Sequence, residues 1–477
     1  MYKKFLKKVL LLLLILLVSI TLSNCAYSSK EKGGYFKKLH SDIPVAGSAR
    51  KVNDGRILIY GEVGNIIFDP KTDTFRKTVL AKKGIGLVSS VSLADGRVLF
   101  VGPNAIEDAP TDELKLYSLV ADDLFKKRLK KYRIVESTLT DSEIRNLRRQ
   151  VYLEEYASLY EDEREKLLLP YLKKNPELMK KYNDCVAEYE QSMHGQIYDP
   201  VTETFEYTKG KLNIRRSDTN LVLLKNGNVL IMGGKTPRDR KIPIGIADEG
   251  MSTRAGRMEI YNPETETFSL VNNTTPIYNV VDAFLLKDGR VFIIYSGKYT
   301  IYDPEKNIFS ETGCLIKYKQ HLKLSDDKIL FFVGPDTTFE TFKLPQHSHN
   351  HQSYLYYFKQ YNISEIVIYD INKKEYKYGG HLLIPRGAPF GLIELKDGNI
   401  LVFGGEDKAE ERKLGDTVLE KKDAEIYNPK TGISKVIKKM NYGRVNDEAI
   451  LLDDGRVLLY GGNYLKPKRI ELYIPEK

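Results

Sequence analysis

Three histidines have the spacing that most directly suggests metal chemistry. The segment Pro345-Gln346-His347-Ser348-His349-Asn350-His351 places an imidazole at every second position. In an extended segment alternate side chains face the same way, so the three rings could converge on a divalent ion such as Zn²⁺. A carboxylate or water would have to complete the ligand set, and a polar loop of uncoordinated histidines explains the same residues. A metal site at His347, His349 and His351 is therefore one hypothesis, and no other cofactor is expected.

A second candidate is a set of side chains that stand eleven or twelve residues before a recurring turn glycine. The set comprises Arg216, Arg386 and Arg444, with Tyr278 at the same position of another unit. Arginine presents a planar fork of donors that fits carboxylates and phosphates. We therefore predict that these residues line a basic channel mouth that binds an acidic peptide or an anionic glycan. The alternative is that the arginines form ion pairs with carboxylates close to them in the sequence. Those carboxylates are Asp218, Asp447 and Glu448.

Residues 1–24 have the composition of an export signal. A lysine-rich stretch at residues 3–8 precedes an apolar run from Val9 to Ile20, which is too short for a membrane-spanning helix. The following Leu22-Ser23-Asn24-Cys25 resembles the lipobox of bacterial lipoproteins. This resemblance implies that Cys25 is acylated, with palmitate for example, and becomes the mature N-terminus. Residues 25–34 are then a flexible tether. An ordinary secretory signal with an incidental cysteine is the alternative.

Composition limits the classes of partner. The chain has 477 residues, 42% of them hydrophobic, and a formal net charge of +10. Four of the positive charges lie in the export signal, so the mature chain carries +6 (10 − 4). That excess falls short of the clustered basic stripes of nucleic-acid-binding proteins, and no nucleic-acid partner is expected. The mature chain also contains Cys185 and Cys314, whose pairing the sequence leaves open.

The strands that position these residues are predicted from a sequence pattern that occurs seven times. Each copy has an apolar run, a turn that usually contains Asp-Gly or Asn-Gly, and a second apolar run, which predicts a β-hairpin with a two-residue type I′ turn. The turn residues occupy positions 53–56, 94–97, 225–228, 287–290, 325–328, 396–399 and 453–456. A second signature follows each hairpin and predicts another turn, because Asp or Asn before Pro favours turn initiation. Its copies start with the residues Asp69-Pro70, Asp199-Pro200, Asn262-Pro263, Asp303-Pro304, Asp370-Ile371 and Asn428-Pro429, and a truncated copy ends at Pro475.

Four antiparallel strands in each of seven units predict an all-β fold, a seven-bladed β-propeller over residues 35–477. The residues also resemble kelch repeats, as in kelch and galactose-oxidase type propellers. The Gly-Gly doublet of that family is intact at Gly233-Gly234, Gly404-Gly405 and Gly461-Gly462. The galactose-oxidase resemblance implies a copper centre with a Tyr–Cys crosslink as an alternative, for which Cys314, Tyr318 and His321 are the nearest matching residues.

The predicted topology separates two faces. The last unit lacks a fourth strand, which residues 34–40 could supply, so we predict that the N-terminal strand closes the ring. All large insertions fall between the second and third strands of a unit, opposite the tight turns, and loops on a rigid scaffold are where binding usually resides. The largest insertion, residues 121–193 in the second blade, has helical spacing and a capping box at Thr140-Asp141-Ser142-Glu143.

These observations predict an exported protein that a lipid at Cys25 anchors to a bacterial membrane. We expect a binding or scaffold protein of the cell envelope that recognises a protein or a glycan through the loop-bearing face. The alternative from another class is a metal-dependent, carbohydrate-active enzyme at the same face. The helical insertion is either a subdomain packed on the propeller or a docking arm for a partner, and the sequence leaves both open.

Overall fold

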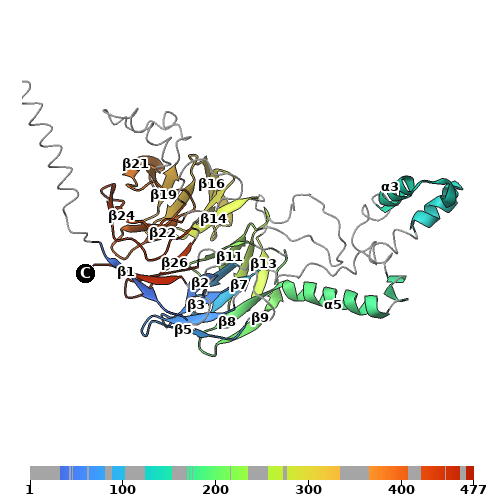
Figure 1. Cartoon of the computed structure of the whole chain (residues 1–477), viewed down its shortest axis with the longest axis horizontal. Helices are drawn as coiled ribbons and strands as arrows, with labels where there is room; N and C mark the ends of the chain where they lie inside the picture. Colours follow the sequence, from blue (N-terminus) through green and yellow to red (C-terminus); the bar gives the residue numbers. More distant parts are fainter. Residues whose placement is uncertain are drawn as a thin grey trace, which may run out of the picture. The chain divides into compact units, whose positions relative to one another are not determined.

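The computed structural model is an all-β, seven-bladed propeller of four-stranded antiparallel sheets, as the repeat predicts. Figure 1 shows the chain coloured from its N-terminus to its C-terminus. The structure describes residues 33–41, 45, 47–61, 64–80, 89–102, 124–152, 169–170, 172–174, 176–214, 216, 218–234, 256–271, 277–333, 365–406, 420–445, 447–461 and 469–476.

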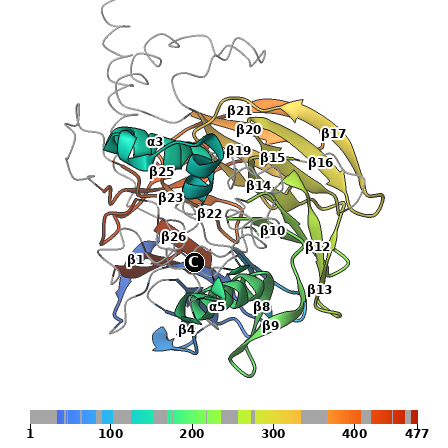
Figure 2. The same ribbon diagram turned by 90° about the vertical axis from the view of Figure 1, so that its right-hand side faces the viewer.

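The first four blades follow one another along the chain, each with its strands in sequence order. Figure 2 shows the strands of blade 4, β14 to β17, side by side. Blade 1 consists of β2 (Ser48–Lys51), β3 (Ile57–Tyr60), β4 (Ile66–Asp69) and β5 (Thr74–Lys77), and blade 2 of β6 (Ser89–Ser92), β7 (Val98–Val101), β8 (His194–Asp199) and β9 (Thr204–Lys211). Blade 3 consists of β10 (Asn220–Leu223), β11 (Val229–Met232), β12 (Glu259–Asn262) and β13 (Thr267–Leu270), and blade 4 of β14 (Val280–Leu285), β15 (Val291–Tyr295), β16 (Lys298–Asp303) and β17 (Ile308–Cys314).

Among the last three blades, blade 7 combines strands from the two ends of the described chain. Blade 5 consists of β18 (Gln320–Lys323), β19 (Lys328–Val333), β20 (Glu365–Asp370) and β21 (Glu375–His381), and blade 6 of β22 (Gly391–Glu394), β23 (Ile400–Phe403), β24 (Ala424–Asn428) and β25 (Ile433–Val436). Blade 7 consists of β26 (Asp447–Leu451), β27 (Val457–Gly461), β28 (Ile470–Ile474) and β1 (Tyr35–Leu39).

Two compact units make up the chain. The first contains residues 1–49, 70–75 and 316–477, and therefore blades 5 to 7. The second contains residues 50–69 and 76–315, and therefore blades 2 to 4 together with β3 and β4 of blade 1.

Apolar side chains from neighbouring blades form the core. The second strand of each blade reads as a continuous apolar run because both of its faces are covered, and all four residues of β23 are buried. In the first unit one cluster joins Phe332 of blade 5 to Val402 and Tyr427 of blade 6. In the second unit a cluster joins Leu99 of blade 2 to Ile231 of blade 3. Each blade is thus held by layers of interdigitating side chains rather than by its own sheet alone.

The hairpin turn differs from the predicted type I′ geometry. Among its loop residues only the third has positive φ, for example 86° at Gly55 and 59° at Asp327. Gly55 N donates to Val52 O, and Val52 N donates to Arg56 O. This pattern is a three-residue loop, a type I turn followed by a left-handed residue, and it requires only one residue with positive φ. The prediction of a two-residue turn was therefore wrong, although the positions of all seven hairpins were right.

The predicted closure by the N-terminal strand is confirmed. β1 pairs with β28 in antiparallel register, from Tyr35 opposite Ile474 to Leu39 opposite Ile470. Figure 1 shows the blue β1 beside the red strands of the chain's end. The ring of Phe36 packs on that of Tyr473 at a centroid distance of 5.3 Å. The outer edge of β28 is therefore covered, which leaves blade 7 with the same four strands as the others.

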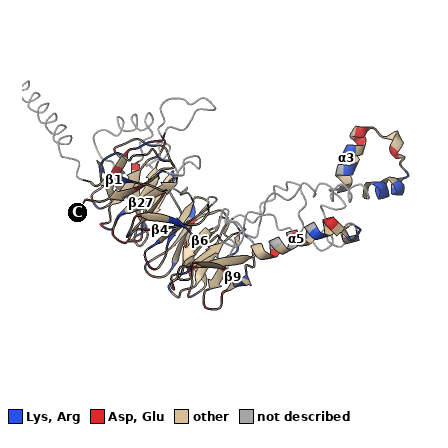
Figure 3. Cartoon of the chain, turned by 60° about the horizontal axis from the view of Figure 1, so that its bottom comes forward, with Lys and Arg blue, Asp and Glu red and all other residues tan. Residues whose placement is uncertain are grey.

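The connection between β7 and β8 in blade 2 contains helices, as predicted. They include η1 (Glu136–Thr138), α3 (Asp141–Tyr152) and α5 (Pro176–Ser192), which ends just before β8. The capping box is present, because Thr140 N donates to Glu143 Oε2 at 2.8 Å and Glu143 N donates to Thr140 Oγ1 at 3.3 Å. Both α3 and α5 carry charges of both signs (Figure 3). Within the described part of the chain, no helix has the length and apolarity that crossing a membrane requires.

Ion pairs fasten the tight turns of consecutive blades at one edge, which we call the turn edge. The arginine that follows the Asp-Gly turn of one blade reaches the Asp-Pro or Asn-Pro turn of the next. Arg56 of blade 1 donates to Glu203 at 2.6 Å and to Pro200 O at 2.9 Å in blade 2. The same clasp joins Arg97 to Glu266 and Arg456 to Asp73. These contacts cross from blade to blade, so each clasp stabilises the ring rather than a single sheet.

The clasp at Glu203 predicts a loss of stability in acid. Hydrogen bonds from Arg76 and Arg56 lower the pKa of Glu203 from 4.5 to about 2. The lowered pKa stabilises the fold above pH 4.5, and this contribution disappears as the pH falls from 4.5 towards 2. We expect Glu203→Gln to remove about 1 kcal/mol of that pH-dependent stability, after allowance for partial exposure. Denaturant unfolding at several pH values measures it. Glu264→Gln, at an exposed carboxylate of the equivalent turn in blade 3, is the control, and equal effects of both substitutions would contradict the clasp.

Candidate functional site

The edge of each blade opposite the turn edge carries the long connections, and we call it the loop edge. The connections between the second and third strands occupy residues 102–193 in blade 2, 233–258 in blade 3, 334–364 in blade 5 and 404–423 in blade 6. In blade 4 the same connection is only Ser296-Gly297, with φ angles of 45° and 73°. The predicted concentration of insertions between the second and third strands is thus present in the strand boundaries.

Several residues predicted to form sites fall outside the described part of the chain. They are the three histidines His347, His349 and His351 and the lipidation residue Cys25. Cys185 lies in α5, but its side chain is not described, whereas Cys314 at the end of β17 is an exposed free thiol. The metal and lipid hypotheses therefore remain predictions.

Arg216 is buried at the base of the connection in blade 3. Its guanidinium donates to Glu259 Oε1 at 3.0 Å, and both side chains are 0% exposed. It also donates to Gly233 O at 3.2 Å and to Arg257 O at 3.0 Å. Gly233 and Arg257 lie at the two ends of the connection between β11 and β12, so a single guanidinium holds both ends of this loop together.

Within the first unit, blade 6 repeats this arrangement, and blade 7 repeats its ion pair and the contact to one end of the connection. Arg386 donates to Glu425 Oε1 at 2.6 Å and to the carbonyls of Gly404 and Asp423, which bound the connection between β23 and β24. Arg444 donates to Glu471 at 3.0 Å and to the carbonyl of Arg469, immediately before β28. We refer to the three Arg–Glu pairs, Arg216–Glu259, Arg386–Glu425 and Arg444–Glu471, as the loop-base clamps.

Each clamp glutamate also accepts backbone hydrogen bonds from the segment that leads to the arginine. Glu425 accepts the N–H groups of Leu383 and Ile384 at 2.6 and 3.2 Å. Glu259 accepts those of Asn213 and Ile214 at 2.7 and 3.1 Å. A buried carboxylate is stable only when paired and hydrogen-bonded, and these contacts meet both conditions.

The geometry differs from the predicted basic channel mouth. The three arginines are among the most buried large side chains, at 0 to 2% exposed, and they contact carboxylates and carbonyls of their own blades. The buried partners are the third-strand glutamates Glu259, Glu425 and Glu471, which lie across the sheet on a strand that sequence distance does not reveal. A ligand-binding role for the arginines remains a prediction that their burial disfavours. Tyr278, in contrast, is 42% exposed just before β14.

Sequence reasoning missed the clamp glutamates, although a signal was present. Glu occurs two residues before the aromatic residue of the third strand only in blades 3, 6 and 7, which are also the blades with the arginine and the Gly-Gly doublet. The other blades have Ile66, Gln196, Thr300 and Val367 at that position. The Gly-Gly doublet also permits close approach of the next blade, because a Cβ on Gly404, with φ of 67°, would lie 2.5 Å from Arg444 O.

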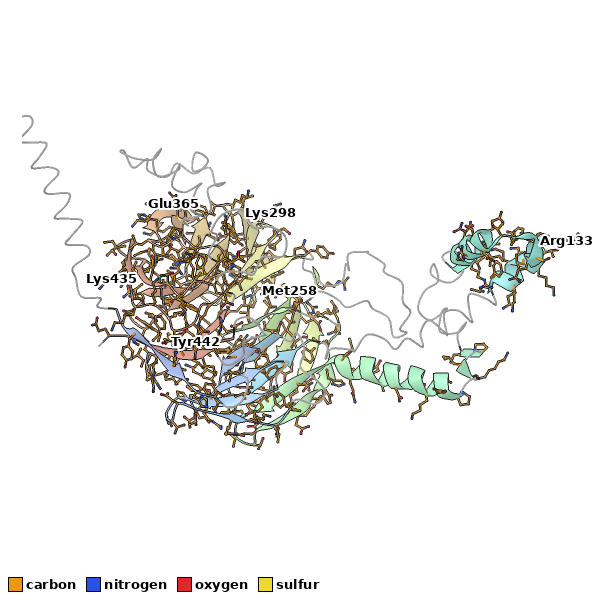
Figure 4. The ribbon with its side chains drawn as sticks, viewed as in Figure 1. Arg133, Met258, Lys298, Glu365, Lys435 and Tyr442 are labelled. Atoms are coloured by element: carbon orange, nitrogen blue, oxygen red, sulfur yellow. The ribbon has the colours of Figure 1, made fainter. Side chains whose placement is uncertain are left out.

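A buried carboxyl group marks the loop edge of blade 5. Glu365 begins β20 and is 8% exposed, and burial raises its pKa to about 7 (Figure 4). His381 is its Cα partner at the end of β21, and burial lowers the pKa of that imidazole, which is therefore uncharged at neutral pH. These two groups lie at the residues that bound the connection 334–364 and its neighbouring strand, and burial favours the uncharged form of each.

The described residues do not assemble a metal site. Across these ranges no group of three or more His, Cys, Asp or Glu side chains could hold an ion. Tyr318 and His321, which the copper-enzyme alternative singles out, pack edge to face at 5.3 Å, and Tyr318 also packs on Phe331 at 4.9 Å. Both rings belong to an aromatic layer of blade 5 that also contains Phe331.

Comparisons with known proteins concern the fold. No protein-family model and no curated protein matches this sequence. Among solved structures, one similar chain is described as a novel fungal alcohol oxidase with catalytic diversity among the AA5 family, in complex with copper. The TM-score is 0.52 at 12% identity, over 94% of this chain and 77% of the other. This chain therefore shares the propeller architecture with that enzyme, and architecture does not determine activity.

The loop-base clamps predict a large cost for removing one partner. Arg386→Ala leaves Glu425 buried without its charged partner, so we expect a loss of about 3–5 kcal/mol in the free energy of unfolding. Denaturant titration followed by circular dichroism measures the loss. Lys377→Ala, at an exposed lysine of blade 5, is the control and should change stability by no more than about 0.5 kcal/mol. A small effect of Arg386→Ala would show that the clamp does not stabilise the blade.

Proposed function

We propose that this protein is a lipid-anchored binding or scaffold protein of the bacterial cell envelope, which recognises a protein or glycan ligand through its loop edge. The observation that carries this proposal is the difference between the two edges of the blades. One edge has short turns, several of which are joined by ion pairs, and the other has connections of variable length, with clamped bases in blades 3, 6 and 7. Variable loops on a rigid scaffold are the usual place for recognition.

The loop-base clamps support recognition because they limit the freedom of each loop where it leaves the sheet. Arg386 bonds to Gly404 O at 2.7 Å and to Asp423 O at 3.2 Å, so the two ends of the connection stay together whatever its sequence. A loop with fixed ends loses less conformational entropy when it binds than one with free ends. The clamps occur in blades 3 and 6, which carry two of the four long connections.

The anchor rests on the lipobox-like Leu22-Ser23-Asn24-Cys25 and on the position of β1. β1 begins at Tyr35 opposite Ile474, beyond the tether predicted for residues 25–34. The variable loop lengths and the clamped loop bases support binding, and the metal-dependent enzyme stays the alternative. Stoichiometric copper in the purified protein would reverse this preference.

Shortening a loop tests recognition. In blade 4 the connection Ser296-Gly297 joins the same two strands, so Ser-Gly in place of residues 334–364 preserves the blade 5 hairpin. We expect at least a tenfold loss of affinity for a ligand identified on a panel of immobilised envelope proteins and glycans. The control carries Asp326→Ala and Lys328→Ala, which remove an exposed ion pair at the turn edge of the same blade. If both proteins bind equally well, blade 5 does not contribute to the ligand surface. If equivalent variants of blades 2, 3 and 6 also bind normally, the loop edge is not the binding surface.

Substituting Cys25 tests the anchor. Cells expressing the intact gene and given an alkyne analogue of palmitate should label the protein, and Cys25→Ala should abolish labelling, because the thiol is the acylation site. The variant should also move from the membrane pellet to the soluble fraction. The exposed Cys314→Ala is the matched control and should label normally. Labelling that survives Cys25→Ala would place the modification elsewhere or remove the lipoprotein assignment.

A further inference from the structure

We propose that the outer surface of blades 5 to 7 binds an anionic phospholipid surface and thereby orients the propeller on its membrane. The surface consists of the outermost strands β21, β25 and β1 with their flanking turns, and we call it the lysine rim. Its exposed lysines are Lys373, Lys374, Lys377, Lys430, Lys435, Lys438, Lys439, Lys37 and Lys38. The proposal builds on the lipid anchor proposed above, but it concerns a different surface from the loop edge.

The three outer strands of the lysine rim follow one another end to end. The last residues of β21 meet the start of β25, because Ser434 Oγ donates to His381 O at 2.8 Å. Residues just after β25 meet those just before β1, because a Cβ on Gly33 would collide with the side chain of Ile437. These contacts all lie within the first unit. The lysines of the three blades therefore lie on connected outer strands, and Figure 4 labels Lys435, which belongs to β25.

The charge of this rim is not a general property of the outer strands. Residues 370–381, 428–440 and 35–40 contain nine lysines and two carboxylates, and two of these lysines, Lys37 and Lys439, form ion pairs with Asp73 and Asp423 outside these ranges. The equivalent segments of blades 2 to 4, residues 199–211, 262–271 and 303–314, contain three lysines and eight carboxylates. Solubility alone would be served by either sign of charge, so the separation of sign between the two sets of blades indicates a partner with negative charge.

Exposed apolar side chains are interspersed with the lysines. Tyr35 is 49% exposed, Ile433 65% and Val436 40%, and all three lie on the outer strands β1 and β25. Tyrosine and lysine together with aliphatic side chains are typical of protein surfaces that lie in the interfacial region of a bilayer. A soluble polyanion would use the lysines but would gain little from these apolar groups, so the composition favours a membrane.

The rim also lies at the point where the anchored segment enters the fold. Gly33 O accepts a hydrogen bond from the Tyr473 hydroxyl at 2.6 Å, which fixes the start of the described chain beside β28 and β1. Cys25 precedes Gly33 by eight residues, which span at most about 28 Å when extended. A lipid on Cys25 would therefore hold the rim close to the bilayer, where each lysine near the anionic surface is attracted to it. At about 0.1 M salt this attraction decays over about 10 Å.

Vesicle binding by a chain without the lipid tests the rim separately from the anchor. Every strand of the seven blades lies between Tyr35 and Ile474, so a chain that begins at Ala26 retains the complete propeller. We expect this chain to sediment with vesicles of phosphatidylcholine mixed with phosphatidylglycerol, but not with vesicles of phosphatidylcholine alone. Binding should weaken as salt is added.

Charge reversal on the rim identifies the residues responsible. The variant Lys377→Glu, Lys435→Glu, Lys438→Glu should bind anionic vesicles at least about 100-fold more weakly. A matched control makes the same change of net charge at exposed lysines of the second unit, Lys209→Glu, Lys298→Glu and Lys306→Glu, and should bind nearly as well as the unsubstituted chain. Equal circular dichroism and unfolding midpoints establish that both variants fold.

Three results would overturn the proposal: binding to neither vesicle, equal binding to both, or equal losses in the two variants. Failure of palmitate labelling with intact binding to anionic vesicles would remove the anchor at Cys25 and leave the rim. The reverse outcome would leave an anchored protein whose rim lysines serve only hydration.

Discussion

The pairing of β1 with β28 is the interaction on which the rest of the structure depends. A propeller blade needs four strands to present two covered faces and a protected outer edge, and the chain ends with only three strands in blade 7. The missing strand comes from the start of the described fold, so the two ends of the sequence are joined by backbone hydrogen bonds from Tyr35 to Leu39. This arrangement also fixes where the preceding residues leave the molecule, beside the outer strand of blade 7.

Two kinds of ion pair stabilise the blades, and each kind joins different parts of them. The turn clasps, such as Arg56–Glu203, are partly exposed and connect consecutive blades. The loop-base clamps, such as Arg386–Glu425, are fully buried and connect the two ends of a single connection. Exposed pairs contribute little individually, whereas a buried pair is costly to break because the remaining charge stays desolvated. The turn edge is thus stabilised by several similar, partly exposed ion pairs, whereas the loop edge is stabilised by a few buried pairs. The buried pairs allow the loops to vary in sequence and length.

A propeller with these features can present different surfaces to different partners. The connections at the loop edge vary from two residues in blade 4 to the long helical connection of blade 2, whereas the outer strands of blades 5 to 7 with their turns carry a net positive charge. Under the two proposals above, the lipid would confine the protein to a membrane, the lysine rim would orient it, and the loops would contact the ligand. The likeness to a fungal alcohol oxidase extends to the architecture, and the loop-edge chemistry of this chain has to be established on its own residues.

The sequence alone determined the architecture because the same short pattern of turn residues and apolar runs occurs seven times. Asp-Gly turns, apolar runs and Asp-Pro turns are local signals, and they located the hairpins, the number of blades, the closing strand and the position of the insertions. Even the helix cap at Thr140 follows from neighbouring residues. Turn type was the local detail that failed, since Asp-Gly fits both a type I′ turn and a type I turn followed by a left-handed glycine.

Only the tertiary structure decided what the arginines do. Their partners Glu259, Glu425 and Glu471 lie 27 to 43 residues away, on a strand brought alongside by sheet formation, and no local spacing predicts that contact. Whether a charged side chain faces solvent or is buried depends on which strands cover it, and the same guanidinium chemistry fits a ligand or an internal carboxylate equally well. The continuity of the lysine rim has the same origin, because its lysines are scattered through the sequence and meet only when outer strands of three blades are placed end to end.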